Sequence, residues 1–178
     1  MRYRRVKITG GTYFFTLNLA ERKKTLLIDH IDILRHIVNK VKQRHPFKRD
    51  AMVILPDHLH AMITLPNGDN DYATRWMLIK QGFSRQIPKT EKINKSRKTR
   101  SERGIWQRRY WEHLIRDEYD YEKHVDYIHY NPVKHGYVKQ AVEWKYSTIH
   151  RYINEGILHP CWGYTGEDSN EAFYGEKR

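Results

Sequence analysis

The sequence predicts a mixed α+β protein built on a split β-α-β-β-α-β sheet, with one additional helix after the last strand. Alternating and helical apolar patterns follow one another in the order strand, helix, strand, strand, helix, strand, helix. Strong turn residues separate the segments, and no internal repeat interrupts them. A length of 178 residues suits one domain, so residues 1–178 are expected to share a single core.

The first strand and helix follow from two different periodicities. Residues 12–19 alternate between two faces after a Gly-Gly turn, which is typical of a strand. Residues 29–44 carry apolar side chains at helical spacing, which predicts a helix. Asp29 is the expected cap at its start, and Pro46 is expected to stop it.

A hairpin is expected next. Residues 51–55 form a short apolar run, and residues 58–65 alternate after the tight connection Pro56-Asp57. In the second of these strands, one face is apolar and the other carries His58 and His60. The pattern therefore predicts a core face and a histidine face.

The second half of the chain is expected to hold two helices, one strand and two polar segments. The helices are predicted at 72–87 and 117–130, the second ended by Asn131-Pro132, and the strand at 106–116. Residues 88–105 are expected to form a basic mobile loop, and residues 157–178 a C-terminal tail.

The composition favours a polyanionic partner. Lys and Arg number 33 against 21 Asp and Glu, and such an excess attracts phosphates. The sequence shows no amphipathic basic helix, lipidation signal, signal peptide or apolar run of membrane length, so a cytoplasmic protein is expected. The single Cys161 excludes an internal disulfide framework and a cysteine-based zinc site.

Two clusters of polar side chains are candidates for chemistry. His58 and His60 lie two residues apart on one strand, so both imidazoles can reach one metal ion. Tyr127 and Asn131 lie four residues apart on a helix and share a face. A metal beside a tyrosine suits phosphoryl transfer through a phosphotyrosine. The alternatives are a surface histidine pair and a tyrosine that only packs, since the chain has 13 tyrosines.

Three segments together resemble a known family. The run from Leu55 to His60 is similar to the HUH motif of single-tyrosine transposases. Residues 106–113 and 124–136 narrow the resemblance to one family among these transposases. The sequence resembles the REP-associated tyrosine transposases, bacterial proteins linked to repetitive extragenic palindromes, over residues 3–150. The resemblance implies a ferredoxin-like fold with a nuclease site on the sheet.

The resemblance also implies roles for individual residues. His58 and His60 would bind a divalent metal, Mg²⁺ or Mn²⁺, and Tyr127 falls on the position of the nucleophile. Asn131 matches a third, amide-type ligand, where related insertion-sequence transposases often carry the longer Gln. The basic N-terminus and the glycine turn resemble the part that contacts DNA beside the palindrome: Arg4, Arg5, Lys7, Gly10, Gly11 and Thr12.

The expected function is therefore a metal-dependent single-stranded DNA endonuclease and transposase. It would cleave and rejoin DNA at palindromic hairpins through a 5′-phosphotyrosine. The protein is expected at the bacterial nucleoid, without a membrane partner or a small-molecule substrate, and as a monomer rather than a dimer. Arg108 and Arg109 could contact phosphates or form a solvated basic edge. Trp76, Trp106 and Tyr110 could stack on unpaired bases or pack in the core, whereas Trp111 is expected in the core.

Three other functions fit parts of the sequence. One is a catalytically silent regulator that binds palindromes, and another is a metal-dependent hydrolase with a water nucleophile. The third is a replication initiator or relaxase, for which 178 residues leave little room. Residues 167–178 are acidic in a basic chain, so they could cover the site, or they could be a terminus without a role.

Overall fold

The computed structural model describes residues 7–93 and 95–163. Its four strands form an antiparallel sheet in the order β2-β3-β1-β4. The strands are β1 (Thr12–Asn18), β2 (Lys48–Ile54), β3 (His58–Thr64) and β4 (Trp111–Leu114). The predicted split β-α-β-β-α-β sheet with an additional helix is confirmed.

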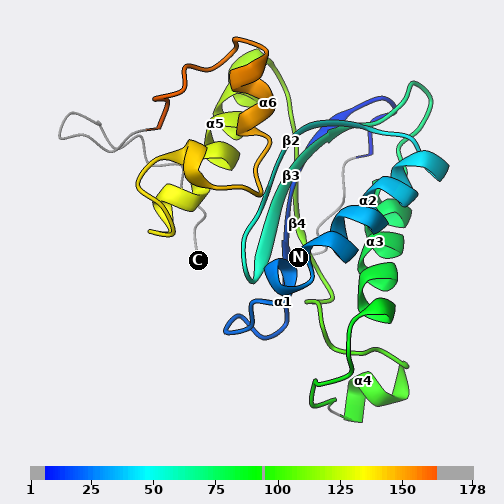
Figure 1. The fold of residues 1–178 in the computed structure, drawn as a ribbon. Coiled ribbons are helices and arrows are strands. Elements are labelled where there is room, and N and C mark those ends of the chain that lie inside the picture. The colour runs from blue at the N-terminus through cyan, green and yellow to red at the C-terminus, as the bar shows by residue number, and fades with distance from the viewer. Residues whose placement is uncertain (1–6, 94, 164–178) are drawn as a thin grey trace, which may run out of the picture.

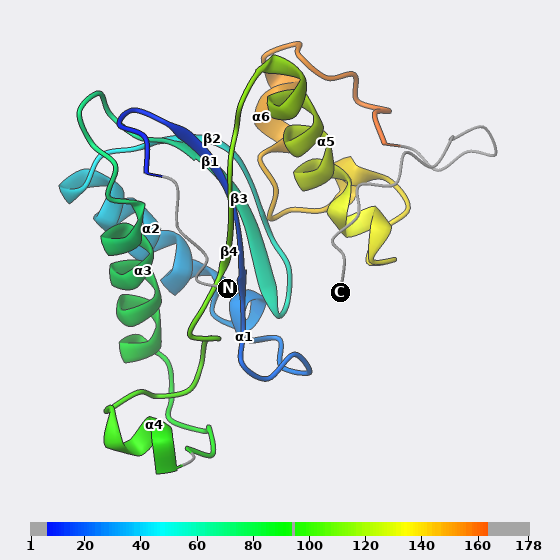
Figure 2. The ribbon, with the colours of Figure 1, turned by 180° about the vertical axis from the view of Figure 1, so that it is seen from behind.

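Helices cover both faces of this sheet. Figure 1 shows α2 and α3 against one face and α5 with α6 against the other, and the reverse view agrees (Figure 2). In the described residues, no helix is long and apolar enough to cross a membrane. The helices are α1 (Leu26–Asp29), α2 (Ile31–Arg44), α3 (Tyr72–Gln86), α4 (Lys95–Thr99), α5 (Glu118–Lys134), the 3₁₀ helix η1 (Ala141–Glu143) and α6 (Ile149–Asn154).

The alternation in β1 divides the core into two layers. Phe15 and its odd-numbered neighbours pack toward α2 and α3, whereas Phe14 packs with residues of α5 and α6. Because helices cover both faces, β3 is buried along its length up to Ile63. The histidine face is therefore not a solvent face: it lies under the layer that contains α5.

Two predicted boundaries at the first helix and the last strand are wrong. Asp29 ends α1 instead of capping α2, and its carboxylate accepts a hydrogen bond of 2.7 Å from the Thr25 hydroxyl. The strand predicted over 106–116 shrinks to β4, because Trp106 makes only an isolated bridge to Leu19. Pro46 does follow the end of α2, as predicted.

The prediction that Asn131-Pro132 ends the helix is also wrong. Pro132 lies inside α5, which continues to Lys134. Proline removes one backbone donor, but the next turn still closes, since the His135 N–H donates to the Asn131 carbonyl at 3.0 Å. Gly136, at φ +70°, follows the end of the helix. This extra turn extends α5 beside the histidines.

The two segments predicted as loop and tail are partly folded. Residues 88–105 include α4, and Arg103 there binds Glu91 in an ion pair of 2.6 Å. Their mobility remains a prediction. Of the tail predicted at 157–178, Leu158 and Trp162 pack against the small cluster around Ile149. The acidic stretch 167–178 lies outside the described residues.

Candidate functional site

The site lies where α5 crosses the histidine face of the sheet. His58 and His60 are 4% and 1% exposed, and their ring centroids are 5.0 Å apart. The ring of Tyr127 lies 5.1 Å from that of His60 and 5.8 Å from that of Phe14. The fold thus brings together the histidine pair and the tyrosine, which the sequence separates by more than sixty positions.

The packing of α5 distinguishes Tyr127 from the other tyrosines of that helix. Tyr119 is 65% exposed, and the Tyr121 hydroxyl lies 3.4 Å from the Asp50 carboxylate. Tyr130 packs with the cluster of Val133 and its neighbours. Among the ring contacts of the described residues, Tyr127 is the tyrosine of α5 that touches His60.

Asn131 is a buried amide with no hydrogen bond to satisfy it. Its side chain is fully buried one turn after Tyr127, and neither its Oδ1 nor its Nδ2 has a hydrogen-bond partner in the described part of the chain. Leaving such a group unpaired costs about 1–3 kcal/mol. An unpaired buried amide of this kind is the expected sign of a ligand that binds there.

Hydrogen bonds at Nδ1 orient both imidazoles. The Nδ1 of His58 lies 2.7 Å from an Asp57 carboxylate oxygen, and Arg22 forms an ion pair with the same carboxylate. The Nδ1 of His60 lies 2.9 Å from the Thr16 hydroxyl. Partners of this kind fix the tautomer and direction of metal-binding histidines, and with Nδ1 engaged in this way a metal would be bound through Nε2.

The electrostatics of the site favour a neutral imidazole beside an ionised carboxylate. Burial, reinforced by the nearby His58 and His135, lowers the pKa of His60 well below its usual value. Burial by itself would raise the pKa of Asp57, but hydrogen bonds from His58 and Arg22 hold it below the usual range. A neutral His60 is the form that binds a metal.

Three residues near the site were missed by sequence reasoning. The ring of His135 lies 5.2 Å from that of His58, and the ammonium of Lys134 lies 4.8 Å from the centroid of the Tyr127 ring. Both depend on α5 continuing past Pro132. Thr16 shares the face of His60 only through the pairing of β1 with β3.

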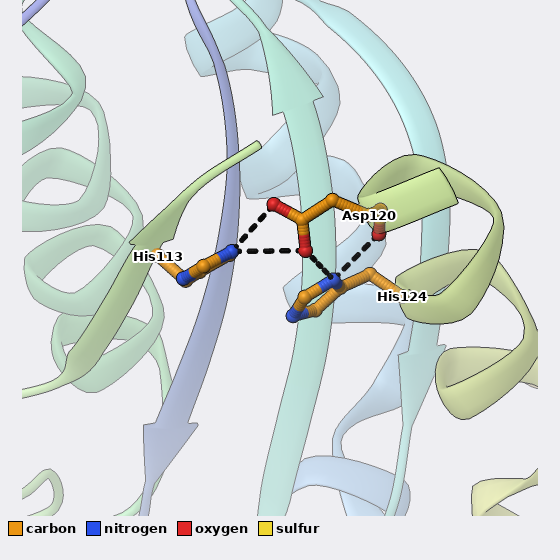
Figure 3. Close-up of side chains that lie close together, drawn as sticks. All are labelled: His113, Asp120 and His124. Carbon is orange, nitrogen blue, oxygen red and sulfur yellow. Dashed lines mark hydrogen bonds and ion pairs between the residues drawn. The ribbon is translucent and has the colours of Figure 1, made fainter. Parts of the chain in front are cut away.

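A second group of metal-ligand types lies on the same face, toward β4. His113, Asp120 and His124 place one ligand atom each within 4.8 Å of one another. Their side chains point toward one another (Figure 3). The His113 Nε2 lies 2.8 Å from the Asp120 carboxylate, and the His124 Nδ1 lies 3.1 Å from it. This group was not predicted from the sequence.

The glycine turn does not join the histidine site. Gly10, at φ +68°, donates its N–H to the Asp69 carbonyl at 2.9 Å. Thr12 pairs with Thr64, whereas His58 pairs with Asn18 at the other end of β1. Six residues along a strand separate the two ends by about 20 Å. Lys7 and Gly11 belong to the same distant end, and Arg4 and Arg5 lie outside the described residues.

The predicted arginines and aromatics divide into exposed and buried side chains. Arg108 and Arg109 are exposed, and Arg108 binds Glu102 at 2.8 Å beside a cleft of about 790 Å³ that Lys80 and Tyr110 also line. Trp111 is 48% exposed, so its expected place in the core is wrong. The other two candidate tryptophans are buried and cannot stack on DNA: Trp76 and Trp106.

The sequence matches the protein family described as "Transposase IS200 like" over residues 8–131. It is 47% identical to a Haemophilus influenzae protein named "Putative REP-associated tyrosine transposase", over 90% of this chain and 92% of that one. It is 45% identical to the "REP-associated tyrosine transposase" of Escherichia coli K12, over 90% and 89%. The fold matches a solved REP-associated tyrosine transposase bound to a REP hairpin at a TM-score of 0.81 and 42% identity, covering 100% of this chain and 98% of that one. With its histidine pair and its tyrosine on one face of the sheet, the chain belongs to the IS200-like transposases and, among them, to the REP-associated tyrosine transposases.

Proposed function

We propose that this protein cleaves and rejoins single-stranded DNA at palindromic hairpins, with Tyr127 as the nucleophile. The observation that carries the proposal is the contact between the Tyr127 and His60 rings, 5.1 Å apart, beside the buried Asn131. The hairpin as partner is supported by the solved relative, which is bound to one, and by the formal charge of +12. We propose a monomer as the active form.

The donor set at this site fits a divalent metal. His58 and His60 would hold it through Nε2, and the unsatisfied amide of Asn131 would supply its Oδ1. Such a metal would polarise a phosphate oxygen and so reduce the negative charge on the phosphodiester that repels an attacking oxygen. Mg²⁺ and Mn²⁺ are the candidates, and two imidazoles favour Mn²⁺ over the oxygen-preferring Mg²⁺.

Tyr127 would carry the covalent step. Its phenolic oxygen forms a bond to phosphorus, the bond from phosphorus to the 3′-oxygen breaks, and that oxygen takes up a proton to become a free 3′-OH. The downstream DNA remains attached through a 5′-phosphotyrosine, and the reverse attack by a 3′-OH rejoins the DNA without ATP. The Lys134 ammonium, 4.8 Å from the Tyr127 ring centroid, places a positive charge beside the attacking side chain.

A hairpin oligonucleotide with single-stranded flanks tests the proposal. It should carry a palindrome from the host genome and be labelled at its 5′ end in one sample and at its 3′ end in another. We expect the 3′ label to migrate with the protein on a denaturing gel, the 5′ label to appear on a shorter strand, and both signals to disappear in EDTA.

Each competing function gives a different gel. A silent regulator binds the hairpin but yields neither product. A hydrolase with a water nucleophile yields the shorter strand without an adduct. Attachment of the 5′ label instead of the 3′ label would contradict the proposed polarity of the attack.

A further inference from the structure

We infer that Trp111 is a stacking platform for an unpaired DNA base next to the phosphodiester that Tyr127 attacks. The inference rests on the proposed function, because it concerns the substrate of that same site. It is carried by the strand register, by the exposure of Trp111, and by the rings that hold the indole in place.

The sheet places Trp111 in line with the metal-binding pair. Thr16 pairs with His60 on one side and with Trp111 on the other. Cross-strand partners face the same side of a sheet, so these three residues form one row across β3, β1 and β4. With neighbouring strands about 4.8 Å apart, the backbones of His60 and Trp111 are roughly 10 Å apart. A base stacked on Trp111 and a phosphodiester beside His60 can therefore belong to one short stretch of the same strand.

Trp111 offers an open aromatic face at the edge of the sheet. It lies on β4, an edge strand, and is 48% exposed, whereas Trp76 and Trp106 are nearly or fully buried. Base stacking needs an aromatic ring that solvent can reach, because every base has a π-face but no base can enter a packed core. Trp111 is therefore accessible enough to stack on a base, whereas Trp76 and Trp106 are not.

A ladder of rings holds the indole in one orientation. Trp111 is parallel to the ring of His113, with an interplanar angle of 3° and centroids 5.7 Å apart. His113 in turn stacks on His124 at 4.7 Å, and the edge of Phe14 meets Trp111 at 5.5 Å. A platform that is rigid before binding loses little conformational entropy when a base stacks on it.

Asp120 fixes this ladder from the side. Its carboxylate lies 2.8 Å from the His113 Nε2 and 3.1 Å from the His124 Nδ1 (Figure 3). It also accepts the Arg116 N–H at 3.0 Å. The two imidazole planes lie 16° apart. Because a metal lies near the plane of each imidazole that binds it, these rings would have to turn out of the stack to share one ion. As they stand, they suit stacking.

Charge on the segment before β4 matches a nucleic acid. Arg108 and Arg109 are exposed, and only Tyr110 separates them from Trp111. Arg108 also lines the 790 Å³ cleft, together with Lys80, Arg97 and Arg100. A phosphate backbone that leaves Trp111 along this segment would meet cations, which favours DNA as the occupant over an apolar protein surface.

The test scans the single-stranded flank of the hairpin in EDTA, so that binding is measured without cleavage. Each base is replaced in turn by an abasic site for affinity, and by 2-aminopurine for fluorescence. We expect one position where an abasic site weakens binding by the wild type about tenfold and where 2-aminopurine is quenched. Trp111→Ala should weaken binding of the intact flank about tenfold and become insensitive to that one position.

Two variants control the result. Trp111→Phe keeps a flat ring and should retain most of the positional sensitivity, which separates stacking from a loss of fold. Tyr119→Ala removes another exposed aromatic, 65% exposed and under the Lys123 ammonium, and should leave the profile unchanged.

Three outcomes overturn the inference. In the first, Trp111→Ala shows the same dependence of binding affinity on the abasic position as the wild type. In the second, the losses of affinity caused by Trp111→Ala and by the abasic site simply add, which would mean that the indole and that base do not interact. In the third, Trp111→Ala changes the sedimentation mass but not DNA binding, which would make this face a contact between two copies of the chain. A missing covalent adduct would contradict the proposed cleavage, whereas the quenching in EDTA tests the platform by itself.

Discussion

The ring of Tyr127 meets the ring of His60 edge-on, at an interplanar angle of 74° and a centroid distance of 5.1 Å. His60 is fixed on a central strand, and Phe14 packs against both rings. Packed neighbours thus hold the tyrosine against the histidine, which leaves it few alternative positions. For a nucleophile, such orientation reduces the entropy lost on reaching the reactive geometry.

Removing the Tyr127 hydroxyl should abolish the covalent adduct. In Tyr127→Phe the ring still packs against His60 and Phe14, so hairpin affinity should stay within about twofold while cleavage falls to background. A denaturing gel and a binding titration measure the two effects. Tyr130→Phe is the matched control on the same helix and should cleave normally. An adduct of normal yield in Tyr127→Phe would assign the nucleophile to another residue.

Neutralising Asp57 should weaken metal binding without unfolding the protein. Asp57→Asn keeps the size of the side chain but loses the charge that orients His58, and such outer partners are typically worth 10–100-fold in metal affinity. Mn²⁺ titration followed by electron paramagnetic resonance measures this change. Asp29→Asn, at an exposed carboxylate of α1, should bind Mn²⁺ like the wild type. Equal affinities of the two variants would exclude this orienting role.

Replacing Asn131 by leucine should raise stability while removing activity. The substitution eliminates a buried amide that has no hydrogen-bond partner among residues 7–93 and 95–163, so the metal-free protein should gain about 1–3 kcal/mol in its free energy of unfolding. Urea titration in EDTA measures the gain, and Mn²⁺ binding and cleavage should be lost. Asn39→Leu, exposed in α2, corrects for the helix propensity of leucine. A destabilised Asn131→Leu would mean that the amide has a structural role.

Hairpin binding should weaken as the pH rises above 8. Burial, with help from the charge of Arg97, lowers the pKa of Lys80 to about 8. Lys80 lines the basic cleft, and it carries its charge below that pH and loses it above. Affinity should therefore fall between pH 7 and 9. Lys80→Arg, which stays charged, should flatten this part of the pH profile in a titration at constant ionic strength. A wild-type profile that is already flat would exclude Lys80 as a phosphate contact.

The sequence by itself determined the elements and their order, because the hydrophobic periods of strands and helices are local properties. The alternation around His58 and His60 fixed their shared face, and the four-residue spacing fixed that of Tyr127 and Asn131. The split β-α-β-β-α-β arrangement followed from the same patterns, and the family followed from the motifs.

Only the tertiary structure decided which residues meet and which are covered. The continuation of α5 past Pro132 depends on its packing against the sheet, and it carries Lys134 and His135 to the site. The exposure of Trp111 depends on β4 being an edge strand. The Asn131 amide lacks a hydrogen-bond partner in the described part of the chain because of the packing of all the side chains around it. Periodicity describes one segment at a time, whereas these properties arise from contacts between segments that are distant in the chain.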